Sequence, residues 1–87
     1  MIRLLVITTK GCEACKLTQT NIIKYLNINN NKEITFMSKD ISEIEDSFKK
    51  EHKLTDFPTI FLIKDNVVSD KYIGYMSRTK LEKFLNI

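Results

Sequence analysis

Two cysteines, Cys12 and Cys15, are the residues whose type and spacing most directly suggest chemistry. They are separated by two residues and stand where an apolar run ends and a helical pattern begins. Two thiols at this spacing can close to a disulfide and open again, and a Cys-x-x-Cys pair at a strand-to-helix turn is typical of redox-active dithiols. The sequence therefore predicts thiol–disulfide chemistry at this turn.

The surroundings of the pair predict different roles for its two thiols. Cys12 falls in the first turn of the expected helix, where free backbone N–H groups and the helix dipole favour a thiolate. The dipole contributes only about 0.3–1 kcal/mol, so hydrogen bonds to the sulfur must add to it, while Lys10 and Lys16 help and Glu13 opposes. We expect a moderately lowered pKa for Cys12, which attacks, and a normal or raised pKa for Cys15, which resolves.

Two other uses of the cysteines stay open at this point. They could form a buried and inert pair, or two chains could share them to bind a metal ion or an iron–sulfur cluster. Two cysteines per chain are too few for a four-ligand site, so no metal is expected within one chain. They are also too few for the disulfide framework of a small secreted module.

The composition predicts one small domain that covers residues 1–87. With 87 residues, of which 43% are hydrophobic, the chain can bury a modest core. The net charge of +3 is spread along the sequence without a basic run, so nucleic acid binding is not expected. The apolar start, Met1 to Ile7, is too short for a signal peptide or a membrane span. We therefore expect a cytoplasmic monomer that does not associate with membranes.

The first half of the chain predicts a strand, a helix and a second strand. Ile2 to Thr9 is almost continuously apolar and suits a central strand that is buried on both faces. Gly11 permits a turn, after which one helical face carries Cys15, Thr18, Ile22, Tyr25 and Leu26. Residues 27–32 are polar and are expected to end that helix, and Glu33 to Met37 alternate as a second strand.

A short second helix is predicted after that strand. Ser42-Glu43-Ile44-Glu45 has the form of a capping box, and Ile44 and Phe48 follow on an apolar face. Acidic residues come early in the segment and lysines come late, as the helix dipole favours. His52 is expected to be a solvated residue at the end of this helix.

The second half continues with two strands and a helix. Thr59 to Ile63 and Val67 to Ile73 read as strands joined by a hairpin turn at residues 64–66. Ser77 can cap a last helix with an apolar face, and the core is expected to include Phe36, Phe48, Phe61 and Phe84. The order βαβαββα predicts an α/β fold in which three helices flank a mixed four-stranded sheet.

Several segments, in this order and spacing, resemble the thioredoxins and their relatives. Cys12-Glu13-Ala14-Cys15-Lys16 resembles the active-site motif of the family with its following lysine, and Asp56-Phe57-Pro58-Thr59-Ile60 resembles the segment that carries its cis-proline. The stretch from Phe57 through Gly74 to Leu85 parallels the C-terminal half of a thioredoxin without a gap. The resemblance implies the thioredoxin fold and a thiol–disulfide oxidoreductase.

The resemblance also implies a substrate-binding surface around the cysteines. Pro58 would be in the cis form beside the pair, and the backbone of Phe57 would bond to an extended segment of the substrate. Gly74 would let a loop approach the active site, and the neighbouring Tyr75 could contact the substrate. The rest of the expected contact surface flanks or separates the cysteines: Gly11, Glu13 and Ala14.

The sequence departs from the family pattern at several positions. Gly11 stands where family members usually have an aromatic residue, and Glu13-Ala14 stands where they usually have Gly-Pro. Val6 occupies the place of a buried acid that would help Cys15 to attack the mixed disulfide. Lys39, at the end of the second strand, or a water molecule is expected to accept the proton instead.

These observations predict a protein disulfide oxidoreductase of the thioredoxin or glutaredoxin type. No bound cofactor is expected beyond the redox-active disulfide of Cys12 and Cys15. Electrons would come from a flavoenzyme like thioredoxin reductase or from glutathione, and the flavoenzyme is favoured because the glycines and acidic residue with which glutaredoxins hold glutathione are not evident after Ile73. The alternative outside enzymology is a binding module in which the dithiol is incidental.

Overall fold

The chain folds in the predicted order of strands and helices. The computed structural model describes residues 1–29 and 33–85. Its elements are β1 (Ile2–Thr8), α1 (Glu13–Asn29), β2 (Ile34–Asp40), the 3-10 helix η1 (Ile41–Glu43), α2 (Asp46–His52), β3 (Thr59–Lys64), β4 (Val67–Ile73) and α3 (Arg78–Leu85). Apart from the added 3-10 helix, the βαβαββα order is confirmed.

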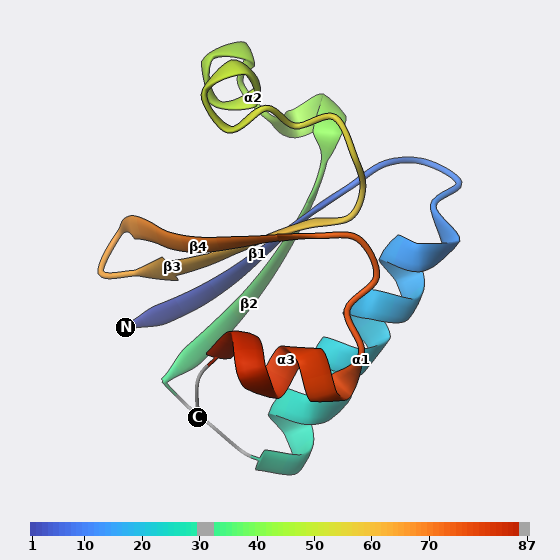
Figure 1. The fold of residues 1–87 in the computed structure, drawn as a ribbon, viewed down its shortest axis with the longest axis vertical. Helices are drawn as coiled ribbons and strands as arrows, with labels where there is room; N and C mark the ends of the chain where they lie inside the picture. Colours follow the sequence, from blue (N-terminus) through green and yellow to red (C-terminus); the bar gives the residue numbers. More distant parts are fainter. Residues whose placement is uncertain (30–32, 86–87) are drawn as a thin grey trace.

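The strands form one mixed sheet in the order β2-β1-β3-β4 (Figure 1). β1 runs parallel to β2 and antiparallel to β3, and β3 is antiparallel to β4. The parallel pair needs a long crossover, which α1 provides. Because β1 has a neighbour on each side, its apolar sequence is explained by burial: Leu4, Val6 and Ile7 are fully buried.

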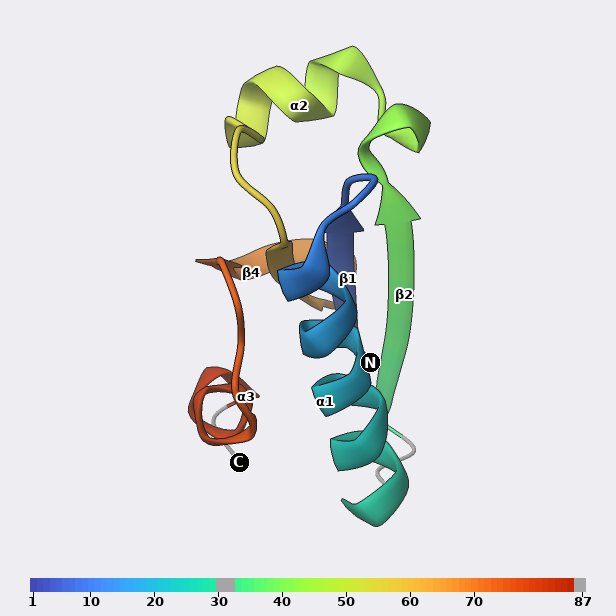
Figure 2. The same cartoon turned by 90° about the vertical axis from the view of Figure 1, so that its right-hand side faces the viewer.

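Helices α1 and α3 lie next to each other on one side of the sheet and close the main core (Figure 2). The buried residues of α1 are those that the helical spacing predicted: Cys15, Thr18, Ile22 and Tyr25. Of these, Ile22 and Tyr25 belong to one core cluster with apolar residues of the strands, among them Val6 and Ile60, and with Leu81 of α3. Fully burying one such aliphatic side chain is worth roughly 1.5–3 kcal/mol, so this layer holds α1 firmly against the sheet.

α2 packs on the opposite side of the sheet through aromatic rings (Figure 1). Phe48 and His52, one helical turn apart, lie 5.4 and 5.0 Å from the ring centroid of Phe61 and 4.3 Å from each other. The side chain of His52 is 21% exposed, and its Nε2 lies 3.2 Å from the Glu51 carboxylate. The expectation that His52 is solvated is therefore wrong, because the i, i+4 spacing places it on the same face as Phe48.

The start of the second helix also differs from the prediction. The capping box joins Asp40 and Glu43, not Ser42 and Glu45, and it opens η1. The Asp40 carboxylate accepts both the amide and the hydroxyl of Ser42, at 2.9 and 2.6 Å. α2 begins only at Asp46, with no side-chain bond at its cap. Asp40, at the end of β2, thus caps η1 in place of Ser42, and the second α-helix begins later than predicted.

Two elements of the first half are longer than predicted. α1 continues to Asn29, whose side-chain amide donates to the Tyr25 carbonyl at 2.8 Å. The rest of the predicted polar turn, residues 30–32, lies outside the described residues. β2 continues to Asp40 because its pairing with β1 runs as far as Thr8. In both cases a hydrogen bond formed in the folded chain extends the element.

The predicted hairpin joins β3 and β4. Asp65 and Asn66 both have positive φ, 50° and 69°, as a two-residue turn between twisted antiparallel strands requires. The N-terminal amine lies 3.1 Å from the Asp65 carboxylate. Among the helices of the described ranges, none has both the length and the apolar character that a membrane crossing needs.

Candidate active site

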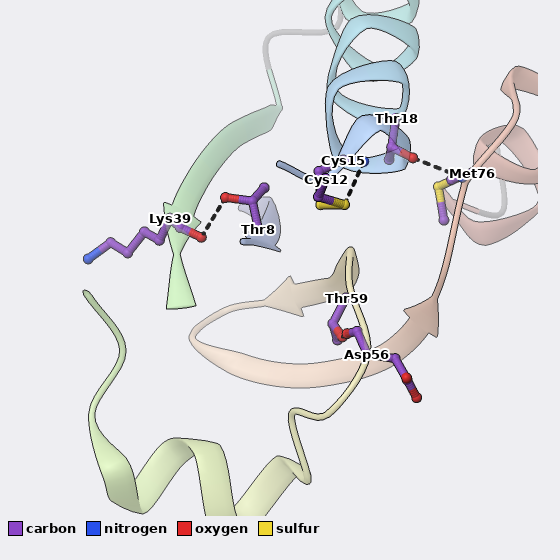
Figure 3. The surroundings of a disulfide bond; sticks show 8 residues. All are labelled: Thr8, Cys12, Cys15, Thr18, Lys39, Asp56, Thr59 and Met76. Carbon is purple, nitrogen blue, oxygen red and sulfur yellow. Dashed lines mark hydrogen bonds between the residues drawn. A yellow bond between two sulfur atoms is a disulfide. The ribbon is translucent and has the colours of Figure 1, made fainter. Parts of the chain in front are cut away.

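The two cysteines form a disulfide at the turn between β1 and α1 (Figure 3). Their Cα atoms are 5.2 Å apart. β1 delivers the chain to this turn, and Gly11, with φ +70°, makes the left-handed step that brings it into the helix. An added Cβ at Gly11 would meet no atom within 4 Å, so the glycine is needed for its backbone conformation and not for space.

The sulfur of Cys12 occupies the capping position of α1. The helix begins at Glu13, and the backbone N–H of Cys15 donates to Cys12 Sγ at 3.1 Å. An oxygen of Ser, Thr or Asp usually accepts this bond. In the reduced protein the same N–H would stabilise a thiolate on Cys12 together with the positive end of the helix. A hydrogen bond to the sulfur is needed in addition to the helix dipole, and this N–H group provides it.

The two sulfur-bearing residues differ in accessibility. Cys15 is 2% exposed and faces the core, as predicted, whereas Cys12 is partly exposed. A disulfide of this kind is open to attack at one sulfur and shielded at the other. Since thiol–disulfide exchange needs access to the attacked sulfur, the arrangement allows an incoming partner to meet Cys12 first.

The charged neighbours predicted for the pair lie at the surface. Lys10, Glu13 and Lys16 are all exposed. Lys10 is close enough to Asp40 to help lower the pKa of that carboxyl, after the two hydrogen bonds from Ser42, which are the larger causes. Lys10 therefore connects the active-site turn electrostatically to the end of β2.

Lys39 does not lie with the cysteines. Its side chain points away from the disulfide in Figure 3 and lines a cavity of about 300 Å³ between α2 and the sheet. The strand register explains this, because Lys39 pairs with Ile7 and shares its side of the sheet, whereas Val6 faces the main core. Lys39 approaches the site only through its carbonyl, which accepts from Thr8 Oγ1 at 3.4 Å. Its predicted role as proton acceptor has no geometric support.

Two buried threonines lie around the disulfide instead, and sequence reasoning gave them no role. Thr18 and Thr59 are 0% and 1% exposed, and both are drawn with the disulfide in Figure 3. Thr59 Oγ1 donates to the Asp56 carbonyl at 2.7 Å, and Thr18 Oγ1 accepts from the Met76 amide at 3.1 Å. Each hydroxyl ties a loop to the site. The sequence signal that could have found them is a threonine at a position where the apolar pattern of the strand or helix predicts a core residue.

The segment before β3 has the predicted cis-proline. The peptide bond between Phe57 and Pro58 is cis, which is confirmed, and Pro58 is buried while Phe57 is partly exposed. The carbonyl of Pro58 accepts from the backbone N–H of Gly74 at 2.8 Å. The proline segment and the loop after β4 are therefore joined directly.

The loop after β4 begins at Gly74, whose φ is +102°. An added Cβ would meet no atom within 4 Å, so the backbone conformation is what favours glycine here. Tyr75 is 48% exposed, whereas Met76 is fully buried in the core. The side-chain amide of Asn21 donates to the Tyr75 hydroxyl and to the Met76 carbonyl, both at 3.1 Å. Asn21 is a third residue, after Thr18 and Thr59, that sequence reasoning missed.

Comparisons with known proteins agree on one family. The thioredoxin family model matches residues 3–87. Mitochondrial thioredoxin 3 from Saccharomyces cerevisiae, in its oxidised form, is 27% identical, with a TM-score of 0.77 over 98% of this chain and 76% of that one. Fasciola hepatica thioredoxin is 19% identical, with a TM-score of 0.78 over 98% of this chain and 78% of that one.

A third similar structure comes from work on how a yeast mitochondrial 1-Cys peroxiredoxin is resolved through the glutathione and thioredoxin systems. It is 26% identical, with a TM-score of 0.78 over 98% of this chain and 76% of that one. A search of curated proteins gave no match. The family match, the fold and the Cys12–Cys15 disulfide together identify this chain as a member of the thioredoxin family and a thiol–disulfide oxidoreductase.

Proposed function

We propose that the protein reduces disulfides in protein substrates, with Cys12 as the nucleophile and Cys15 as the resolving thiol. The observation that carries this assignment is the asymmetry of the pair: the sulfur of Cys12 accepts an N–H bond on a partly exposed residue, whereas Cys15 is 2% exposed. A stabilised and accessible thiolate attacks, and a shielded thiol reacts only with the disulfide formed beside it.

The proposed cycle conserves atoms and electrons. The Cys12 thiolate attacks one sulfur of the substrate disulfide, whose other sulfur leaves as a thiolate and takes a proton. The Cys15 thiol then loses its proton and attacks the Cys12 sulfur, which releases the second substrate thiol. The substrate has gained two electrons and two protons, and the enzyme is left with the Cys12–Cys15 disulfide.

Insulin reduction with dithiothreitol as the electron source tests this assignment. We expect Cys12→Ser to abolish turnover above the dithiothreitol background. We expect the reduced Cys15→Ser variant, mixed with insulin after dithiothreitol has been removed, to accumulate a mixed disulfide, because Cys12 can attack but no second thiol releases the product; mass spectrometry of the unreduced sample detects it. A Cys12→Ser variant that keeps turnover would contradict the assignment, and a wild type that binds partners without reducing them would favour a binding module.

The substrate-contact surface is proposed to consist of the two segments beside the cysteines. The backbone of Phe57 would bond to an extended substrate segment, and Gly74 and Tyr75 would border it. The residues around the attacked sulfur complete this surface: Gly11, Glu13 and Ala14. Support comes from the hydrogen bond between Gly74 and Pro58, which fixes the two segments relative to each other.

For the electron donor we propose a flavoenzyme like thioredoxin reductase, with glutathione as the alternative. The cytoplasm is the proposed location and a monomer the proposed state, with no cofactor beyond the disulfide itself.

We expect the Cys12–Cys15 pair to have an equilibrium potential of about −270 mV, as reducing thioredoxins have, and not one of about −180 to −120 mV, as isomerases and oxidants have. Equilibration against a series of glutathione ratios, followed by alkylation of the free thiols, measures it. A value in the second range would overturn the reductive direction.

A further inference from the structure

The cavity of about 300 Å³ between α2 and the sheet lies on the side of the sheet that α1 and α3 do not cover. Its floor consists of side chains of β1, β2 and β3 that point away from the main core, and its wall is the segment from η1 to α2. The apolar residues that line it are Leu5, Met37, Ile44, Phe48 and Ile63. The cavity is therefore separate from the redox-active turn, and the proposed function makes no use of it.

The cavity opens to solvent beside β2, which is an edge strand of the sheet (Figure 1). Met37, on this strand, is 41% exposed although its side chain lines the cavity. Leu5 and Ile63, on the next two strands, are half-buried. A concave and mostly apolar surface with a few charged groups at its border is the usual form of a small-molecule site, and the flexible Met37 side chain can adapt to a ligand.

The dimensions of the cavity limit the size of the ligand. A cavity of about 150 Å³ holds one benzene ring, so a cavity of about 300 Å³ holds roughly twelve non-hydrogen atoms. The floor is elongated: Arg3 pairs with Thr35, and Lys39, which also lines the cavity, lies four residues further along β2. At about 3.3 Å per residue this is a length of about 13 Å. A chain of about ten carbon atoms with a small polar end suits both the volume and the length.

The charged residues of the lining favour an anionic end next to Arg3. Arg3 is half-buried, and among the ion pairs of residues 1–29 and 33–85 none involves Arg3 or Lys39. A partly desolvated guanidinium gains from an anionic partner, and its planar fork matches a carboxylate. The acids of the lining, Glu43 and Glu45, are exposed and belong to the wall that follows the far end of β2. They therefore oppose an anion less at the Arg3 end than at the Lys39 end.

We propose that this cavity binds a small amphiphilic carboxylate, such as a fatty acid of about ten carbon atoms. Its chain would lie on Leu5, Met37 and Ile63, and its carboxylate would pair with Arg3. Removal of the chain from water supplies most of the affinity, and the ion pair selects the sign of the polar end. This site is independent of the redox reaction, because it lies on the other side of the sheet from α1 and contains neither cysteine.

A nuclear magnetic resonance titration of the ¹⁵N-labelled protein tests the ligand class. The probes are sodium decanoate and, with the same chain length and the opposite charge, decylammonium chloride, both kept below their micelle concentrations. We expect decanoate to shift the amide signals of β1, β2 and the segment from η1 to α2 until they saturate, and decylammonium to bind at least about 5-fold more weakly. This factor corresponds to about 1 kcal/mol, the upper value for a partly exposed ion pair.

Two substitutions with matched controls test the position of the ligand. Arg3→Gln should weaken decanoate binding about 5-fold, whereas Arg78→Gln, at an exposed position of α3, should leave it unchanged. Met37→Trp fills the cavity from its open edge and should abolish the saturable shifts. Its control is Val67→Trp, at a 66% exposed position of β4 on the opposite edge of the sheet, which should bind like the wild type.

Each outcome decides the proposal. Saturable decanoate binding that depends on both Arg3 and Met37 supports it. Decylammonium binding as tight as that of decanoate, or an unchanged affinity in Arg3→Gln, would overturn the anionic class of ligand. Binding that persists in Met37→Trp, shifts spread over the whole protein, or no saturation would overturn the site itself. If thermal unfolding shows that Met37→Trp does not fold, the comparison of Arg3→Gln with Arg78→Gln decides.

Discussion

Thr18 shows how one uncharged side chain can position a loop at the redox site. It lies on the core face of α1 and is fully buried, yet its hydroxyl oxygen accepts the amide of Met76 at 3.1 Å. A buried N–H group without an acceptor costs about 1–3 kcal/mol. The Thr18 hydroxyl therefore stabilises the loop after β4, because without it the Met76 amide would be buried without an acceptor.

We expect Thr18→Val to lower the free energy of unfolding by about 1–3 kcal/mol, because valine fills the same space and leaves the Met76 amide unpaired. Urea denaturation measures the change. The matched control is Thr20→Val on the same helix, where an exposed hydroxyl donates to the Lys16 carbonyl at 3.0 Å; this change should stay within about 0.5 kcal/mol. Equal effects of the two substitutions would refute the role of Thr18.

Among the elements, η1 depends on a charge at its start. The Asp40 carboxylate accepts two bonds from Ser42 and also lies within the influence of Lys10, and these contacts lower the pKa of Asp40 below its ordinary value of 3.8. The ionised form is thus favoured in the folded protein. Asp40 therefore contributes stability above its unfolded pKa, and that contribution disappears as the pH falls through its folded pKa.

We expect the stability advantage of the wild type over Asp40→Asn to be present at pH 7, to decline as the pH falls below the ordinary Asp40 pKa of 3.8, and to vanish once the pH is below the lowered pKa of the folded protein. Asparagine still caps a helix but does not titrate. Urea denaturation of both proteins across this range measures the difference, and Ser42→Ala, which removes the hydroxyl bond, should also reduce the pH dependence. If the stabilities of wild type and Asp40→Asn run parallel at all pH values, the titration belongs to other groups.

At the scale of the whole molecule, apolar periodicity predicted the order of the elements. A strand or helix that buries one face repeats its apolar residues at a fixed period, and that repeat can be read within each short segment. The cap at Asp40 was missed because the end of β2 is set by pairing with β1, which sequence spacing does not encode. The packing of His52 on Phe61 was missed for another reason: His52 was treated as a solvated helix end, although its i, i+4 spacing from Phe48 places the two side chains on one face.

In the candidate site, too, the local motifs were predictable from the sequence and the long-range contacts were not. The cysteines were visible from their spacing and the cis-proline from resemblance, since both are local motifs. The contact of Asn21 with Tyr75 joins residues 54 positions apart, and an asparagine on a helix surface gives no sign of its partner. Lys39 lies near the end of β2, as predicted, but the register with β1 places its side chain on the side of Ile7, and the sequence alone does not give that register.

The bond from the Cys15 amide to the Cys12 sulfur has a thermodynamic consequence. One atom both begins a helix and exchanges electrons, so the two equilibria are linked: whatever makes the first turn of α1 prefer a charged sulfur also makes the dithiol form easier to reach. Glu13 shows the conflict, since an acid in the first turn favours the helix and repels a thiolate. Because an acid that repels the thiolate disfavours the dithiol form, Glu13 raises the reducing strength of the pair at the same time as it stabilises the first turn of the helix.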